Sequence, residues 1–217
     1  MSIMDRADDL IAQQRLLDHP FYSAWSEGRL SREAIEAYAG QYFHWVNAFP
    51  TFLSLTHAQC PDLTVRQEIL ENLNDEEMGP DNHPELWLRF CDALGLDRAD
   101  VRANRVFPET QEAIDSFRAV CGSGPFVAGL AALYAYEAQQ PEVAAEKRRG
   151  LTNLYDLPDG HDFFVEHETA DVAHSAAERR LIEANVNGDG AAILEGVQAG
   201  LDAVTTLLDG VHQRFVA

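Results

Sequence analysis

Apolar residues recur along this chain at spacings of three and four, the pattern of amphipathic helices. No segment alternates polar and apolar residues with a period of two, so no strand is predicted. Glycine and proline pairs such as Gly79-Pro80 and Gly124-Pro125 separate the helical stretches. The pattern therefore predicts an all-α bundle. Its predicted helices cover residues 3–16, 19–28, 31–60, 64–77, 83–94, 108–119, 125–149, 161–187 and 191–215.

Local signals refine these boundaries. Thr64-Val-Arg-Gln67 matches a capping box and predicts a helix start. Pro50 and Pro141 are expected to kink their helices, because proline cannot donate the backbone hydrogen bond. For Pro141 the carbonyl left without a donor is that of Glu137. Gly150 is expected to end the helix that precedes it.

Length and composition are those of one folded unit, and we expect a single domain over residues 1–217. Hydrophobic residues make up 46% of the chain and charged residues 24%, without repeats or low-complexity tracts. The longest apolar stretches, such as 126–136, are too short to cross a bilayer. The first residues carry acids early and do not resemble a signal peptide. Three unpaired cysteines suit reduced thiols, so we expect a cytoplasmic protein without a membrane segment.

The formal net charge of −20 argues against nucleic acid as a partner, because phosphate binding needs a basic face. The basic residues cluster once, at 146–149. A cluster at a helix end commonly complements the helix dipole. Acidity at this level favours solubility and does not identify a substrate.

The most informative segment is His167-x3-Asp171-x2-His174. At about 100° per residue, these three side chains fall within roughly 60° of one another on one helix face. Two imidazoles and one carboxylate on one face form half of a site for a divalent metal ion. A solvated polar face would have the same pattern.

Three further residues elsewhere in the chain offer matching ligand types. Glu76 and His83 flank Gly79-Pro80 and can converge from the end of one helix and the start of the next. Either one could instead be an ordinary surface or helix-start residue. Glu137 lies mid-helix among Leu and Tyr side chains, where a lone carboxylate costs much desolvation free energy unless it is paired, protonated or metal-bound.

Together these residues form a set suited to two metal ions. Three carboxylates leave about one net positive charge on two divalent ions, and six ligands leave coordination positions for dioxygen and substrate. Mixed nitrogen and oxygen donors favour iron or manganese, whereas zinc has no redox chemistry. The chain lacks the Glu-x-x-His motif of ferritin-type bundles. The predicted metal ligands are Glu76, His83, Glu137, His167, Asp171 and His174.

Several motifs make the chain resemble the haem-oxygenase-like di-metal oxidases. They are Glu71-Asn-Leu-Asn-Asp-Glu-Glu77 with His83-Pro-Glu-Leu-Trp87, Tyr136-Glu137-Ala-Gln with Pro141, and the segment 167–174. Within that superfamily, which also holds thiaminase-type and pyrroloquinoline-synthesis proteins, it is most similar to the chlamydial protein associating with death domains. The resemblance implies a seven-helix bundle in which the six residues above bind Fe/Fe or Fe/Mn. It also implies dioxygen as co-substrate, an unidentified electron donor and a homodimer.

That subgroup makes p-aminobenzoate for folate by consuming itself in a single turnover. A tyrosine supplies the aromatic ring and a lysine is the implied amino donor. The matching positions are Tyr22, in His-Pro-Phe-Tyr22, and Lys147. Tyr136 is a candidate for radical relay or for a hydrogen bond near the metal. Tyr22 as a core aromatic and Lys147 as a helix-end cation are the plainer alternatives.

Other functions stay open on this scaffold. A related di-metal oxidase would act over many turnovers on an external small molecule, such as a fatty or amino acid. An interaction module would retain a vestigial metal site. A metal phosphohydrolase would use His161-Asp162, although the remaining ligands do not fit its usual order. Thiaminase-type chemistry needs a cysteine motif, and the metal-free quinone-cofactor oxidase relies on basic side chains. The cysteines of this chain lie in no such motif, and this acidic chain offers few basic side chains.

Overall fold

The computed structural model describes residues 1–217 and contains helices but no strands, which confirms the all-α prediction. The helices enclose one hydrophobic core, in which the largest apolar side chains are aromatic. The helices are α1 (Ile3–Gln13), α2 (Pro20–Ser26), α3 (Arg32–Gln59), α4 (Leu63–Glu77), α5 (His83–Ala93), α6 (Arg98–Ala103), α7 (Pro108–Ser123), α8 (Phe126–Glu137), α9 (Gln140–Asn153), α10 (Asp162–His167), α11 (Ala170–Ala184) and α12 (Gly190–Phe215), with a 3-10 turn, η1 (Leu16–Asp18).

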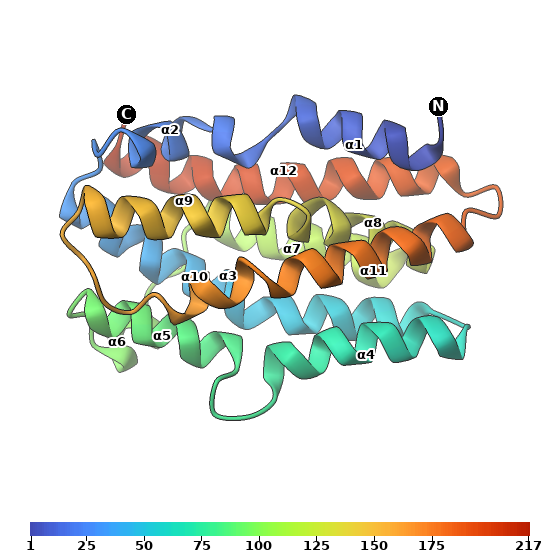
Figure 1. The fold of residues 1–217 in the computed structure, drawn as a ribbon, viewed down its shortest axis with the longest axis horizontal. Helices are drawn as coiled ribbons and strands as arrows, with labels where there is room; N and C mark the ends of the chain where they lie inside the picture. The colour runs from blue at the N-terminus through green and yellow to red at the C-terminus, as the bar shows by residue number, and fades with distance from the viewer.

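The long helices run nearly parallel or antiparallel to one another (Figure 1). Helix α12 packs on α8 and α7, while α3 packs on α7, α4 and α5. Helices α1 and α2 lie along one edge of the bundle in this view, and α4 and α5 lie along the opposite edge (Figure 1). Helix α11 contacts both α8 and α4. The space enclosed by α4, α5, α8, α10 and α11 therefore receives side chains from segments far apart in the sequence.

The resemblance implied seven helices, whereas the structure traces twelve α-helical segments because breaks divide longer helices. The stretch 125–149 splits into α8 and α9 at residues 138–139, just before Pro141, as the missing N–H predicts. The stretch 161–187 splits into α10 and α11 at residues 168–169, a break that the sequence pattern did not indicate. Helix α3 continues through Pro50.

Two boundaries that were predicted from a named local signal were wrong. Asp62, not Thr64, caps α4, because its side chain accepts from the backbone N–H groups of Thr64 and Val65. Gly150 does not end α9, which continues to Asn153. A Cβ on Gly150 would lie 2.8 Å from Cδ1 of Trp25, so this glycine gives room to a buried indole.

One helix, α12, has the length and apolar composition of a bilayer span, but half of that stretch is buried inside the bundle. Its buried face includes Val197, Leu201, Val204 and Leu208. Helix α12 is therefore a core helix of this bundle.

The contact between α12 and α8 depends on glycine. A Cβ on Gly196 would overlap the carbonyl oxygen of Ala128 and lie 2.9 Å from its Cα, and backbone atoms cannot rotate away. We expect Gly196→Ala to lower the free energy of unfolding by about 2–3 kcal/mol, as overpacked cores do. Gly122→Ala is the matched control: its Cβ would meet only Leu55 at 3.4 Å, and it gains helix propensity of up to about 1 kcal/mol. Urea denaturation of both variants measures the difference, and equal stabilities would contradict it.

Candidate metal centre

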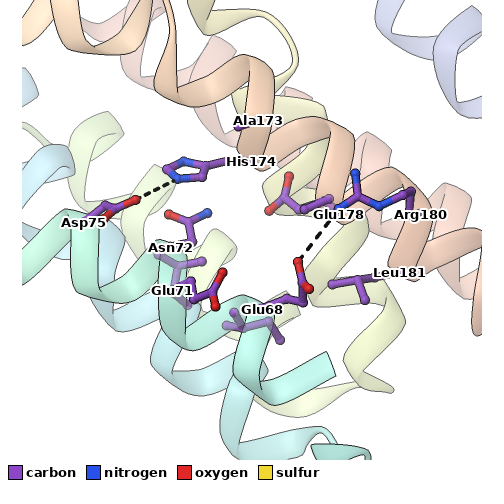
Figure 2. A pocket seen from close by; sticks show the side chains of 12 residues that line it. Glu68, Glu71, Asn72, Asp75, Ala173, His174, Glu178, Arg180 and Leu181 are labelled. Carbon is purple, nitrogen blue, oxygen red and sulfur yellow. Dashed lines mark hydrogen bonds and ion pairs between the residues drawn. The ribbon is translucent and has the colours of Figure 1, made fainter. Parts of the chain in front are cut away.

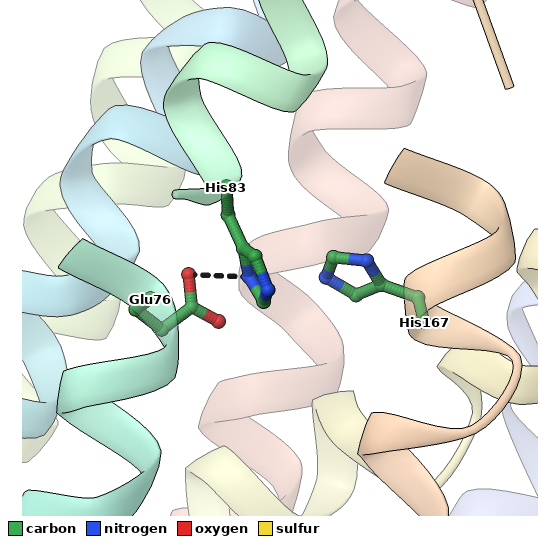
Figure 3. A group of neighbouring side chains, drawn as sticks. All are labelled: Glu76, His83 and His167. Carbon is green, nitrogen blue, oxygen red and sulfur yellow. Dashed lines mark ion pairs between the residues drawn. The ribbon is translucent and has the colours of Figure 1, made fainter. Parts of the chain in front are cut away.

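The first group of converging side chains is Glu76, His83 and His167 (Figure 3). Helix α4 ends just after Glu76, Gly79 turns the chain with a φ of 81°, and Asn82 caps α5 so that His83 is its first residue. His167 is the last residue of α10. One potential ligand atom from each side chain lies within 4.8 Å of the other two. His83 Nδ1 is 2.8 Å from Glu76 Oε2, and all three side chains are buried.

The second group is Glu137, Asp171 and His174, again with ligand atoms within 4.8 Å of one another. Glu137 is the last residue of α8, and the other two project from α11. Asn72 of α4 donates its side-chain N–H to both oxygens of Glu137, at 3.0 and 3.2 Å. His174 Nδ1 is 3.7 Å from Asp171 Oδ1.

Two of the imidazoles are oriented by a hydrogen bond from the nitrogen that faces away from the cluster. His167 Nδ1 is 2.7 Å from the carbonyl oxygen of Phe163, which leaves Nε2 free. His174 Nε2 is 3.2 Å from Asp75 Oδ2, which leaves Nδ1 facing Asp171. Such contacts fix the tautomer of an imidazole and direct its lone pair toward a metal ion.

The electrostatics of both groups favour a bound cation. Burial raises the pKa of Glu137 to about 8 and that of Asp171 to about 6. The carboxylates of Asp171 and Glu76 raise the pKa of Glu137 further. Although burial opposes it, the carboxylates of Asp171 and Glu137 raise the pKa of His174 to about 9. Burial, and then His83, lower the pKa of His167. His174 is the one basic side chain beside the two carboxyl groups of the second group, and a bound cation would further offset the cost of burying them.

Unsatisfied polar atoms test whether metal ions fit this arrangement. Asp171 Oδ2 and His174 Nδ1 are buried and form no hydrogen bond, and the only polar contact of His83 Nδ1 is the one with Glu76. A cavity of about 10 Å³, lined by Glu76, His167, Asp171 and Tyr136 among others, lies between the two groups. Buried polar groups normally have partners. The donor set and its unsatisfied atoms therefore fit a pair of transition-metal ions.

The structure brings the six predicted ligands together, but in two groups. His167 lies on α10 and joins Glu76 and His83, while Asp171 and His174 lie on α11 with Glu137. The prediction that one helix face carries all of 167–174 was wrong, because the helix breaks at residues 168–169.

Three nearby polar residues were missed. Asn72 and Asp75 bond to two of the predicted ligands from α4. Glu178 is buried on α11, one turn beyond His174. The spacing Asp171-x2-His174-x3-Glu178 places all three on one helix face and is a signal that could have found Glu178.

Lys147 is buried in a cluster of aromatic rings and does not lie at a solvated helix end. Its Nζ is 4.5 Å from the ring centroid of Tyr42, 5.4 Å from that of Tyr38 and 5.6 Å from that of Tyr22. Burial without an acidic partner lowers the pKa of Lys147 to about 7. Its neighbours Arg148 and Arg149 instead form exposed ion pairs with Glu168 and Glu146.

Four buried tyrosines connect this cluster to the metal centre. Tyr136 lines the small central cavity, and its hydroxyl is 2.6 Å from that of Tyr42. The rings of Tyr42 and Tyr38 have centroids 5.1 Å apart. The hydroxyls of Tyr38 and Tyr22 are 3.4 Å apart. Burial raises the pKa of each of the four phenols above its ordinary value, so all four are neutral.

His161 and Asp162 do not join the centre. His161 Nε2 bonds to the carbonyl oxygen of Leu157 at 2.8 Å, and Asp162 lies 3.6 Å from Arg89 on the surface. Neither residue of the pair considered for a metal phosphohydrolase belongs to a group of converging ligands. The three cysteines are buried and unpaired.

Comparison with known proteins agrees with this geometry. Residues 36–205 match the family of iron-containing redox enzymes. The chain belongs to this family. A 4-aminobenzoate synthase of Nitrosomonas europaea is 44% identical over 225 residues, which cover 98% of this chain and 92% of that protein. A 4-aminobenzoate synthase of Chlamydia trachomatis is 38% identical, covering 96% of this chain and 91% of its own.

A solved structure of a CADD-like protein from Nostoc punctiforme superposes with a TM-score of 0.80 and covers 98% of both chains. Its sequence identity of 18% carries the fold alone. The expected haem-oxygenase-like fold is thereby confirmed, and this chain is an iron-containing redox enzyme.

Proposed function

We propose that this iron-family enzyme is a 4-aminobenzoate synthase that uses its own Tyr22 as the source of the ring and Lys147 as the source of nitrogen. The observation that carries the proposal is the buried, unpaired amine of Lys147 among three tyrosine rings, joined by Tyr42 and Tyr136 to the candidate metal centre. The similarity to two 4-aminobenzoate synthases over nearly the whole chain supports it.

The two groups of buried ligands would hold a pair of ions, Fe/Fe or Fe/Mn, with Glu76, His83 and His167 around one and Glu137, Asp171 and His174 around the other. Bound iron supplies the ability to reduce dioxygen and so provides oxidising equivalents. The proposal includes an external electron donor and a cytoplasmic setting. The protein's own part is to orient the imidazoles through Phe163 and Asp75 and to exclude water from the centre.

The tyrosines provide a route from the metal centre to Tyr22. Tyr136 would lose an electron and its hydroxyl proton to the reduction of dioxygen, and Tyr42 can restore both along the 2.6 Å hydrogen bond between the two hydroxyls. The same exchange then passes from Tyr42 to Tyr38, whose ring centroids are 5.1 Å apart, and from Tyr38 to Tyr22, whose hydroxyls are 3.4 Å apart. Burial of all four rings keeps water away from the oxidised phenols.

Lys147 has the properties of an amine nucleophile. A pKa near 7 leaves a large fraction of its Nζ unprotonated at neutral pH, whereas an ordinary lysine is almost fully charged. The amine lies above the tyrosine rings and has no carboxylate to hold its proton. It is therefore placed to attack a ring carbon made electron-poor by oxidation.

The product dictates which bonds change. In 4-aminobenzoate the carboxyl carbon stands para to nitrogen, as Cβ of tyrosine stands para to its hydroxyl. The ring and Cβ are therefore retained, and the Cα–Cβ bond of Tyr22 breaks. A C–N bond to the Lys147 nitrogen replaces the C–O bond, whose oxygen leaves as water, and the Nζ–Cε bond of Lys147 breaks to release the amine. Cβ is oxidised to a carboxyl carbon and dioxygen is reduced. Each chain can do this once.

An external substrate is the competing function, and one cavity favours it. A space of about 320 Å³ lies between α4 and α11 and is bordered by His174. Its lining also includes Glu68, Glu71, Asp75 and Arg180, which suits a small polar molecule such as an amino acid better than a fatty acid. This function requires many turnovers without damage to the chain.

Intact-mass spectrometry separates the two functions. Purified protein loaded with Fe²⁺, or with Fe²⁺ and Mn²⁺, is exposed to air and a chemical reductant. We expect about one equivalent of 4-aminobenzoate per chain at most, with a matching loss of mass at Tyr22 in peptide maps. An intact Tyr22 side chain beside accumulated product would overturn the proposal, and so would repeated turnover on an added substrate with an unchanged mass.

A further inference from the structure

Glu178 is a buried carboxylate that neither of the two ligand groups includes. Only 4% of its surface is exposed, and neither of its oxygens has a hydrogen-bond donor. Glu178 follows His174 by one turn of α11 and borders the same cavity as His174 and Asn72. A buried carboxyl group without a hydrogen-bond donor needs a proton or a cation beside it.

The basic side chains near Glu178 are engaged with other carboxylates, and His174 contacts Asp75 and Asp171. Figure 2 shows His174 and Glu178 projecting from α11 beside Asn72 of α4, at the inner end of the cavity between the two helices. Arg180 turns toward Glu68, with 3.8 Å between Nη2 and Oε2. The amide N–H group of Asn72 is already donated to Glu137. The carboxylate of Glu178 is thus left facing the second ligand group.

The two ligand groups differ in a way that Glu178 accentuates. The first has two imidazoles and one carboxylate, and the second has one imidazole and two carboxylates. With Glu178, the site as a whole has four carboxylates against two divalent ions, which would cancel the net charge that three carboxylates leave. A buried pair of cations is stabilised when its ligands neutralise it.

We propose that Glu178 is an additional carboxylate ligand of the second metal ion, the ion held by Glu137, Asp171 and His174. The inference rests on the proposed function only in taking the centre to bind metal. Glu178 borders the cavity between α4 and α11, so it would bind the second metal ion from the side that faces this cavity. The class of ligand is a hard divalent cation such as Mn²⁺ or Fe²⁺, which carboxylates favour.

Mn²⁺ binding tests the assignment without reference to activity. Metal-free wild type, Glu178→Gln and Glu71→Gln are titrated with Mn²⁺ alone, and free Mn²⁺ is counted by electron paramagnetic resonance. Gln keeps the size and polarity of the side chain but loses the negative charge. Glu71 borders the same cavity and is exposed, so its variant is the matched control. We expect two sites in the wild type and in Glu71→Gln, and a loss of about tenfold or more at one site in Glu178→Gln.

Thermal unfolding gives a second readout that guards against a misfolded variant. Removing a buried carboxyl group that has no partner leaves metal-free Glu178→Gln at least as stable as the metal-free wild type, and Mn²⁺ should raise its Tm less. Two sites of wild-type affinity in Glu178→Gln would overturn the Glu178 assignment alone. A wild type that binds no Mn²⁺ would overturn both the assignment and the proposed metal centre. Failure to detect product from Tyr22, with the Glu178 effect intact, would overturn only the proposed synthase activity.

Discussion

Tyr22→Phe yields a folded protein that binds metal and makes no 4-aminobenzoate. The substitution removes only the hydroxyl, whose single contact is a long 3.4 Å bond to Tyr38, so we expect a stability loss of about 1 kcal/mol or less. Phenylalanine has no phenolic proton to give up and cannot be oxidised at the potentials that oxidise tyrosine. Product should fall below detection, measured by liquid chromatography after iron loading in air, while metal content by elemental analysis stays unchanged.

The neighbouring rings supply the control for this result. Lys147 Nζ lies closer to the rings of Tyr42 and Tyr38 than to that of Tyr22, so distance alone does not select the ring that is lost. We expect Tyr42→Phe to slow product formation by interrupting the route from Tyr136, with Tyr22 still the residue consumed. Product from Tyr22→Phe together with loss of the Tyr42 side chain would identify Tyr42 as the ring donor instead.

Much of this bundle could be predicted from apolar spacing and from breakers. Gly79-Pro80 correctly separated α4 from α5, and this break is what allows Glu76 and His83 to meet from two helix ends. Pro141 correctly interrupted the helix after Glu137, because a proline has no N–H for that residue's carbonyl. These features are local, and a few adjacent residues determine each of them.

The parts that could not be predicted depend on contacts between distant segments. A glycine after a helical stretch commonly ends the helix, yet Gly150 lies inside α9. A glycine is needed there because Trp25 occupies the space that a side chain would fill. The break at residues 168–169 separates His167 from Asp171, and no proline or glycine marks it. Asn72 and Asp75 lie in an acidic stretch of α4, and the sequence alone does not distinguish them from surface residues. Their contacts with Glu137 of α8 and His174 of α11 appear only in the folded bundle.

Lys147 is the residue for which local sequence was most misleading. It stands in Glu146-Lys147-Arg148-Arg149, a run that reads as a charged helix end. The two arginines follow that expectation and pair with surface acids, whereas the lysine points inward among aromatic rings. Helical periodicity alone allows one member of such a run to face the core, and the tertiary structure decides which one.

Lys147→Met should make the protein more stable at neutral pH while it abolishes product formation. Methionine keeps the apolar length of the side chain and removes an amine that is buried without an acidic partner. The pKa of Lys147 is lowered from 10.5 to about 7, so between these values the unfolded chain binds a proton that the folded chain does not. The free energy of unfolding therefore decreases by up to about 1.4 kcal/mol for each pH unit by which the pH falls within that window.

The sign of this linkage fixes the pH dependence of the comparison. Near pH 7 we expect Lys147→Met to raise the free energy of unfolding by about 2–4 kcal/mol, and the gain should shrink toward zero as the pH approaches 10. Arg148→Met, which removes an exposed ion pair with Glu168, should change stability by less than about 1 kcal/mol at every pH. Guanidinium chloride unfolding at several pH values measures all three proteins.

Product formation by the wild type should follow the same amine. Because only unprotonated Nζ can attack, we expect the yield to rise as the pH passes through about 7 and to level off above it. Protein grown with lysine labelled with heavy nitrogen should release 4-aminobenzoate that carries the label. Unlabelled product, or product from Lys147→Met, would show that nitrogen comes from elsewhere. A Lys147→Met variant less stable than the wild type at pH 7 would contradict the burial of an unpaired amine, because the substitution removes that amine and keeps the apolar length of the side chain.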